Sequence, residues 1–174
     1  LLGGHVDYRV PGVEISTGSL GHGLPIAVGM ALAAKRNNKK YTVSVLLSDG
    51  EMESGANWEA LNMASAQKLD NLVLIIDRNG LQAMGSTEDI LPMKNLNERI
   101  ISFGCSCVKI DGHDFNAIDS IFQKIPLRED QPTVIIANTV KGKGVSFMEN
   151  KIEWHYKSPN AEQLSQAIKE LERI

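Results

Sequence analysis

The chain has 174 residues, of which 43% are hydrophobic and 22% are charged, and its 18 Lys and Arg against 21 Asp and Glu give a net charge of −3. This length suits about one domain with a core of its own. The slightly acidic balance argues against a nucleic-acid-binding protein, and no apolar run approaches the roughly 18 residues that a membrane span needs.

Strand-like and helix-like patterns alternate along the chain, without repeats or low-complexity tracts. Apolar residues at helical spacing predict helices, and short continuous apolar runs predict strands that are covered on both faces. The predicted elements, in chain order, are a helix at 18–35, a strand at 42–47, a helix at 57–68, strands at 72–76 and 107–110, a helix at 116–124, a strand at 133–138 and a helix at 160–173. This alternation predicts an α/β fold with an open, doubly wound, mainly parallel sheet and helices on both of its faces.

Two further features concern the second half of the chain. Residues 140–157 are predicted to form a long loop, and a loop of this length inside a compact domain is usually functional. Cys105 and Cys107 stand one residue apart on a predicted strand, where a disulfide between them would be badly strained. We therefore expect reduced thiols and a cytoplasmic location.

Polar turns follow two of the predicted strands. Asp49 comes after the strand at 42–47, and Asn79 comes after the strand at 72–76. In an open α/β sheet, ligands bind beyond the carboxyl ends of the strands, so both side chains are expected to reach one point there. Their oxygens suit Mg²⁺ or Ca²⁺, with phosphate oxygens completing the coordination. From spacing alone, a helix cap at Asp49 and a turn at Asn79 explain the same residues.

These turns also resemble a known motif. Ser48-Asp49-Gly50 followed by Asp77-Arg78-Asn79 resembles the thiamine-diphosphate motif, which opens with Gly-Asp-Gly and ends in Asn. Further segments resemble the N-terminal domain of transketolase, in the same order along the chain: Gly4-His5, Pro11-Gly12-Val13-Glu14, Ser16-Thr17-Gly18-Ser19-Leu20-Gly21, Trp58-Glu59-Ala60, Lys141-Gly142-Lys143-Gly144 and Trp154-His155. The resemblance implies that residues 1–174 are a single thiamine-diphosphate-binding domain, with the upstream family segment missing.

The resemblance assigns roles by position. It implies that Mg²⁺ (or Ca²⁺) is bound by Asp49, by the side chain of Asn79 and by the backbone carbonyl of Leu81. The residues implied to bind thiamine diphosphate are Gly18, Ser19, Leu20, Gly50, Asn79, Lys141 and His155. His5 and His155 are implied to be catalytic, because neutral imidazoles shuttle protons near neutral pH. The alternatives are an ordinary terminal residue for His5, an ordinary solvated loop cation for Lys141 and a packing residue for His155.

The implied reaction transfers a two-carbon ketol unit from a ketose or its phosphate to an aldose or its phosphate. In the family, a separate pyrimidine-binding domain supplies the Glu that activates the cofactor, and later domains supply arginines for the substrate phosphate. No second domain fits in 174 residues. The chain is therefore expected to be either a separate subunit of a split enzyme or a fragment of a longer chain. We expect activity only with a pyrimidine-binding partner subunit, in a dimer of such pairs, with sugars as substrates and with neither nucleic acid nor membrane as a partner.

Some residues depart from the family pattern and keep other functions open. Ser48 replaces the first Gly of the motif, His22 stands where the family often has Gln, and Ser54 stands where it often has the Glu of a carboxylate relay between two cofactor sites. These departures leave a catalytically degenerate binding module as one alternative. The α subunit of a 2-oxo acid dehydrogenase E1 component is another, although Trp154-His155 and Gly18-Ser19-Leu20-Gly21 argue against it.

Overall fold

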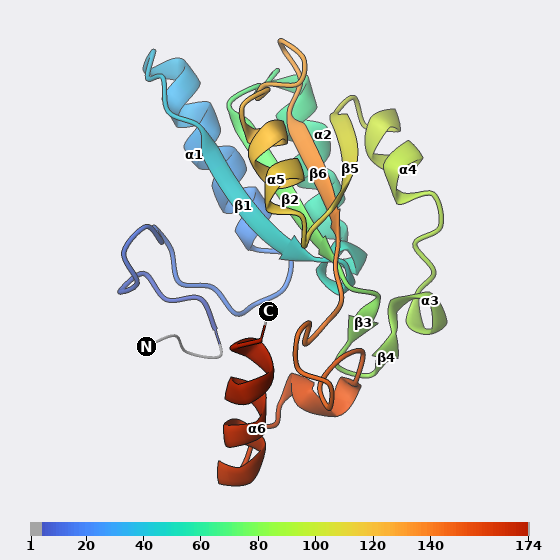
Figure 1. Cartoon of the computed structure of the whole chain (residues 1–174). Coiled ribbons are helices and arrows are strands. Elements are labelled where there is room, and N and C mark those ends of the chain that lie inside the picture. Colours follow the sequence, from blue (N-terminus) through green and yellow to red (C-terminus); the bar gives the residue numbers. More distant parts are fainter. Residues whose placement is uncertain (1–4, 174) are drawn as a thin grey trace.

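The computed structural model describes residues 5–173, in which four parallel strands form the central sheet (Figure 1). The strands are β1 (Val43–Ser48), β2 (Leu72–Arg78), β5 (Ser106–Asp111) and β6 (Thr133–Asn138), in the order β1-β2-β6-β5. Each neighbouring pair is parallel. The open, mainly parallel sheet predicted from the sequence is therefore confirmed.

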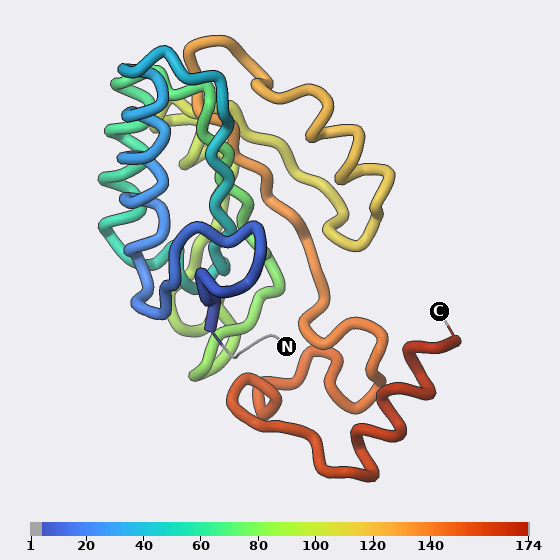
Figure 2. Tube along the Cα trace, turned by 90° about the vertical axis from the view of Figure 1, so that its left-hand side faces the viewer, coloured from blue at the N-terminus to red at the C-terminus, as the bar shows by residue number. Residues whose placement is uncertain are grey.

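The chain forms six α-helices in the part that the structure describes. They are α1 (Gly23–Arg36), α2 (Gly55–Ala66), α3 (Thr87–Ile90), α4 (Leu96–Ser102), α5 (Phe115–Phe122) and α6 (Ala161–Leu171), with the short 3-10 helices η1 (Gly50–Glu53) and η2 (Ile152–His155). Figure 2 shows α1 and α2 next to each other on one side of the sheet and α5 on the other. Within residues 5–173, no helix combines the length and the apolar character that crossing a bilayer requires.

The core has two parts because β2 lies inside the sheet and is covered on both faces. Leu72 and Ile76 pack with residues of α1, α2 and α4 in the larger cluster. Val73 packs on the opposite face with Ile135 of β6 and Ile121 of α5. This two-sided burial explains the continuous apolar run of the strand, and it confirms the prediction of helices on both faces.

The first helix begins later than the sequence predicts. α1 begins at Gly23, whereas the predicted helix begins at residue 18. Gly21 has φ 82°, a left-handed conformation that interrupts a right-handed helix. Residues 18–22 therefore form a turn that leads into α1.

Short elements between the main strands and helices were not predicted. The strands β3 (Leu81–Gln82) and β4 (Gly85–Ser86) form an antiparallel hairpin directly after β2. The predicted loop at 140–157 contains η2, which contacts β3. The segment after β6, with η2 and α6, extends beyond the carboxyl ends of the strands (Figure 1).

Candidate functional site

Asp49 lies where β1 ends and η1 begins. Its side chain is buried, with Asp49 only 5% exposed, and its two oxygens accept hydrogen bonds from Gly50 N at 2.9 Å and from Gly80 N at 2.7 Å. Gly80 belongs to the turn after β2, and the β1–β2 register places Ser48 opposite Asp77. The parallel pairing thus brings the two predicted polar turns to one edge of the sheet.

Asp49 takes part in no ion pair within residues 5–173. The ion pairs within residues 5–173 join Arg9 to Asp7, Lys68 to Asp130 and Arg78 to Glu88. Burial raises the pKa of Asp49 against the lowering effect of its two backbone donors. The negative charge of Asp77 raises this pKa further, and the positive charge of Arg78 lowers it. A buried carboxylate is costly unless it is paired with a cation or binds a metal ion. The surroundings of Asp49 therefore fit a divalent cation with this carboxylate as its charged ligand.

Asn79 and Leu81 lie in the same turn as Gly80. Asn79 Oδ1 accepts a hydrogen bond from Leu81 N at 3.0 Å, and Asn79 Nδ2 lies 3.4 Å from Asp77 Oδ1. An amide oxygen has two acceptor positions, so one remains available for a metal ion. The structure thus gathers Asp49, Asn79 and Leu81 in two adjoining turns, as a shared set of oxygen ligands requires.

Gly50 is buried at the start of η1 and leaves little space for a side chain. A Cβ there would lie 3.1 Å from atoms of the Gln82 side chain, whose Nε2 donates to Glu53 Oε1 at 3.1 Å. The resemblance assigns the Gly50 amide to the diphosphate, whereas in this structure that amide donates to Asp49. Binding of a diphosphate at Gly50 therefore requires this amide to be shared or turned.

The chain after β6 returns to the same edge. Thr139 N donates to Arg78 O at 3.1 Å, and its hydroxyl donates to Asp77 Oδ1. His155 lies in η2, which contacts β3. Partial burial lowers the pKa of His155, and the positive charge of Lys141 lowers it further.

Trp154 holds the η2 segment in place. Its Nε1 donates to Phe147 O at 2.8 Å, and its ring centroid lies 5.2 Å from that of Phe147. Lys157 Nζ lies 4.7 Å from the Trp154 centroid, within the range of a cation–π contact. The neighbouring His155 is thereby carried on an anchored segment rather than on a free loop.

The N-terminal residues of the candidate site form a second group. His5 lies against Gly18, where an added Cβ would stand 3.0 Å from His5 Cδ2. Leu20 is 63% exposed, and no side-chain hydrogen bond within residues 5–173 ties His5 or Ser19 to the group around Asp49. The two groups are joined instead through η1, because Gly21 N donates to Glu51 Oε1 at 2.9 Å.

Three residues of this network were not predicted as site residues. Asp77 accepts from Thr139 next to the Asp49 turn, and Glu51 fixes the turn at Gly21. Asp77 stands within the recognised motif and Glu51 directly follows it, so both could have been found from their positions. Thr139 carried no signal in the sequence.

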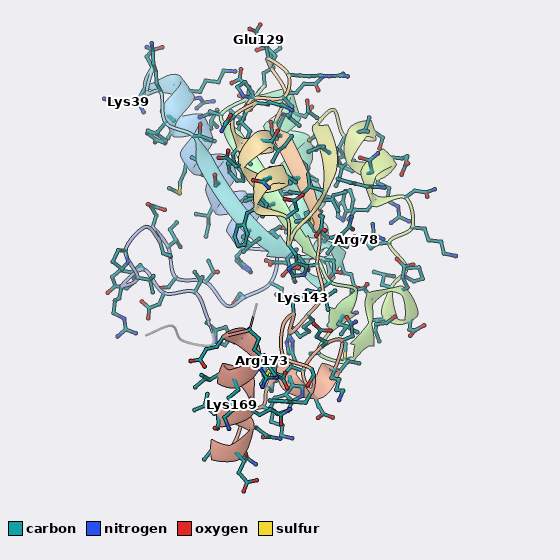
Figure 3. The ribbon with its side chains drawn as sticks, viewed as in Figure 1. Lys39, Arg78, Glu129, Lys143, Lys169 and Arg173 are labelled. Carbon is teal, nitrogen blue, oxygen red and sulfur yellow. The ribbon has the colours of Figure 1, made fainter. Side chains whose placement is uncertain are left out.

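Figure 3 shows Arg78 and Lys143 toward the carboxyl ends of the strands, and Lys39 and Glu129 at the opposite end.

Comparison with known proteins identifies the family of this chain. The family model for the transketolase thiamine diphosphate binding domain matches residues 2–172. The chain is 43% identical over 175 residues to an apulose-4-phosphate transketolase subunit of Phocaeicola vulgatus, covering 100% of this chain and 62% of that protein. It is 44% identical over 171 residues to the protein of the same name in Actinobacillus succinogenes, covering 98% of this chain and 62% of that protein.

A solved structure gives the same result for the fold. The transketolase of Campylobacter jejuni matches with a TM-score of 0.85 and 30% sequence identity, over 94% of this chain and 27% of that one. The chain thus spans less than two thirds of the length of these relatives. The resemblance noted in the sequence is confirmed: the chain belongs to the family of the transketolase thiamine-diphosphate-binding domain.

Proposed function

We propose that this chain is the diphosphate-binding subunit of a split transketolase that depends on thiamine diphosphate and Mg²⁺. The observation that carries the proposal is the buried Asp49 carboxylate, which forms no ion pair within residues 5–173 and adjoins the Asn79 turn. Two relatives are themselves named as single subunits of a transketolase, which supports a separate partner chain.

In this proposal, the metal ion is bound by Asp49, by Asn79 Oδ1 and by the Leu81 carbonyl. These are hard oxygen ligands, and they leave coordination positions for diphosphate oxygens and water, as Mg²⁺ usually requires. Ca²⁺ accepts the same ligands with looser geometry. The two backbone donors to Asp49 hold its carboxylate in a fixed orientation for the ion.

Thiamine diphosphate, when bound, supplies the electron sink for breaking the carbon–carbon bond of a ketose. The cofactor is expected to be lined by Gly18, Ser19 and Leu20, with Gly50 at the diphosphate. The positive charge of Lys141 suits the diphosphate end. His155, whose pKa is lowered, is neutral at pH 7 and can take a proton from a sugar hydroxyl, and His5 is the second group proposed to move protons.

A pyrimidine-binding subunit is proposed as the partner, in a dimer of such pairs. That partner would supply the Glu that activates the cofactor, as the family resemblance implies. The names of the two relatives make apulose 4-phosphate the first ketose phosphate to test. The free cysteines Cys105 and Cys107 support a reducing, cytoplasmic location.

Cofactor binding is tested by the thermal stability of the purified chain with Mg²⁺ and thiamine diphosphate, added together and separately. A ligand at about 100 times its dissociation constant stabilises by about 2.7 kcal/mol, which for a chain of this size raises Tm by about 5–10 °C. We expect this rise for the wild type when both are present, and none for Asp49→Ala.

Asn160→Ala is the matched control, because Asn160 caps α6 in a capping box and its loss costs about 1 kcal/mol of stability without touching the site. This variant should start from a lower Tm and still show the full rise. An equal rise for Asp49→Ala would overturn the metal assignment. No rise in the wild type would favour the degenerate binding module instead.

A further inference from the structure

His113 lies in the turn that follows β5, and its imidazole contacts the chain that leaves β6. His113 Nε2 accepts a hydrogen bond from Val140 N at 2.8 Å. The turn itself is held at two points, because His113 N donates to Asp111 Oδ1 at 2.9 Å and Gly112 N donates to Asn138 O at 2.8 Å. The imidazole acceptor is therefore presented from a fixed piece of backbone.

The two segments approach each other closely at this place. A Cβ at Gly112 would lie 2.5 Å from Thr139 Cγ2 and 3.1 Å from Ala137 Cβ. Only a residue without a side chain permits this distance between the β5 turn and the end of β6. The contact of His113 with Val140 is thus part of a tightly packed junction.

Residues 139 and 140 are anchored on opposite sides. Thr139 is bound to β2, through its amide to Arg78 O and through its hydroxyl to Asp77. Val140 is bound to the β5 turn through His113. Because β6 lies between β2 and β5, these bonds fix the direction in which the chain leaves the sheet.

Lys141 comes next and has a second fixed point on its other side. Gly142 has φ 74°, and a Cβ there would lie 2.8 Å from backbone atoms of Met148. Lys141 O also accepts a hydrogen bond from Asn150 N at 2.9 Å. The Lys141 backbone is therefore placed between the Val140 anchor and the Gly142 turn.

We propose that His113 is a positioning residue, which places Lys141 for the diphosphate by accepting the hydrogen bond of Val140 N. The role of Lys141 rests on the proposed function, whereas the anchoring of Val140 does not. The bond requires a lone pair on Nε2, so the proton of the neutral imidazole is on Nδ1.

The anchor is tested by NMR on the purified chain without cofactor. The nitrogen shifts of His113 should show the tautomer with the proton on Nδ1. In His113→Leu the Val140 amide should exchange with solvent faster than in the wild type. In His113→Gln it should stay protected, because the Gln side-chain oxygen reaches close to the position of Nε2. Asn116→Leu is the control, since Asn116 is exposed on α5 and its side chain makes no hydrogen bond within residues 5–173.

The positioning role is tested by the affinity of the same variants for thiamine diphosphate in the presence of Mg²⁺. We expect His113→Leu to weaken binding about fivefold, the size expected for one hydrogen bond, and we expect His113→Gln and Asn116→Leu to bind like the wild type. Unchanged Val140 exchange in His113→Leu would overturn the anchor itself. Faster exchange with unchanged affinity would overturn the positioning role, and a wild type that binds no cofactor would overturn both that role and the proposed function while leaving the anchor in place.

Discussion

His155 is the candidate catalytic residue whose protonation the structure describes. Partial burial lowers its pKa, and the positive charge of Lys141 lowers it further, because both disfavour the protonated imidazole. An ordinary histidine has a pKa near 6.5, so a lowered value makes His155 more completely neutral at pH 7. A neutral imidazole is the form that accepts a proton from a sugar hydroxyl.

Removal of the Lys141 charge should therefore raise the pKa of His155. We expect Lys141→Met to move the NMR titration midpoint of His155 to higher pH, and to move in the same direction the acid limb of any rate that needs neutral His155. Lys143→Met is the matched control, because Lys143 lies two residues away and is exposed. A midpoint that does not change in Lys141→Met, or one that moves equally in Lys143→Met, would contradict this account.

Among the elements, the turn at residues 18–22 and the 3-10 helix η1 depend on each other. Gly21 N donates to Glu51 Oε1 of η1, and the left-handed conformation of Gly21 brings it against Ser54. A Cβ at Gly21 would lie 2.9 Å from Ser54 Cβ. The small Ser54, at a position where the family often has Glu, thus packs against the turn that carries the expected cofactor-lining residues.

Gly21→Ala should destabilise the protein, because it adds both a clash and backbone strain. We expect the free energy of unfolding to fall by about 1–3 kcal/mol, measured by chemical denaturation. Gly29→Ala provides an opposite control, since Gly29 lies within α1 and a Cβ there meets no atom within 4 Å. That variant should be more stable than the wild type by about 0.5–1 kcal/mol. Equal effects of the two substitutions would show that Gly21 has no special conformational role.

Element by element, the sequence predicted the long, regular parts of the fold. β2 is buried on both faces of the sheet, so successive residues along it are apolar, and this continuous run made the strand recognisable. α4 has 7 residues and α3 has 4, which is too short for a helical period to be recognised. The early start predicted for α1 was wrong. Leu20 stands at helical spacing from Leu24, but Gly21 between them adopts a left-handed conformation.

The candidate site was predictable to a similar degree. Asp49 and Asn79 could be expected to meet, since both follow strands and parallel strands end at one edge of the sheet. The contribution of Thr139 could not be predicted, because it depends on β6 lying next to β2. Local sequence patterns do not reveal the order of strands in a sheet. For the same reason the bond from Val140 to His113 emerges only from the fold.

At the scale of the whole molecule, the candidate residues are accessible in the single chain. Leu20 is 63% exposed, and His5 and His155 are also exposed. A cofactor that lies between two protein chains leaves such residues accessible on each chain by itself, whereas Asp49, the proposed charged ligand of the metal ion, is already buried. This distribution supports a site that is completed by a partner.

The most direct test of this account measures ketol transfer by the chain alone, by a pyrimidine-binding partner on its own and by their mixture. Each sample contains Mg²⁺ and thiamine diphosphate, with apulose 4-phosphate as the first ketose tested, and Asp49→Ala mixed with the partner serves as the control. We predict turnover only in the mixture with wild-type Asp49. Turnover by this chain alone, or equal turnover with Asp49→Ala, would contradict the account.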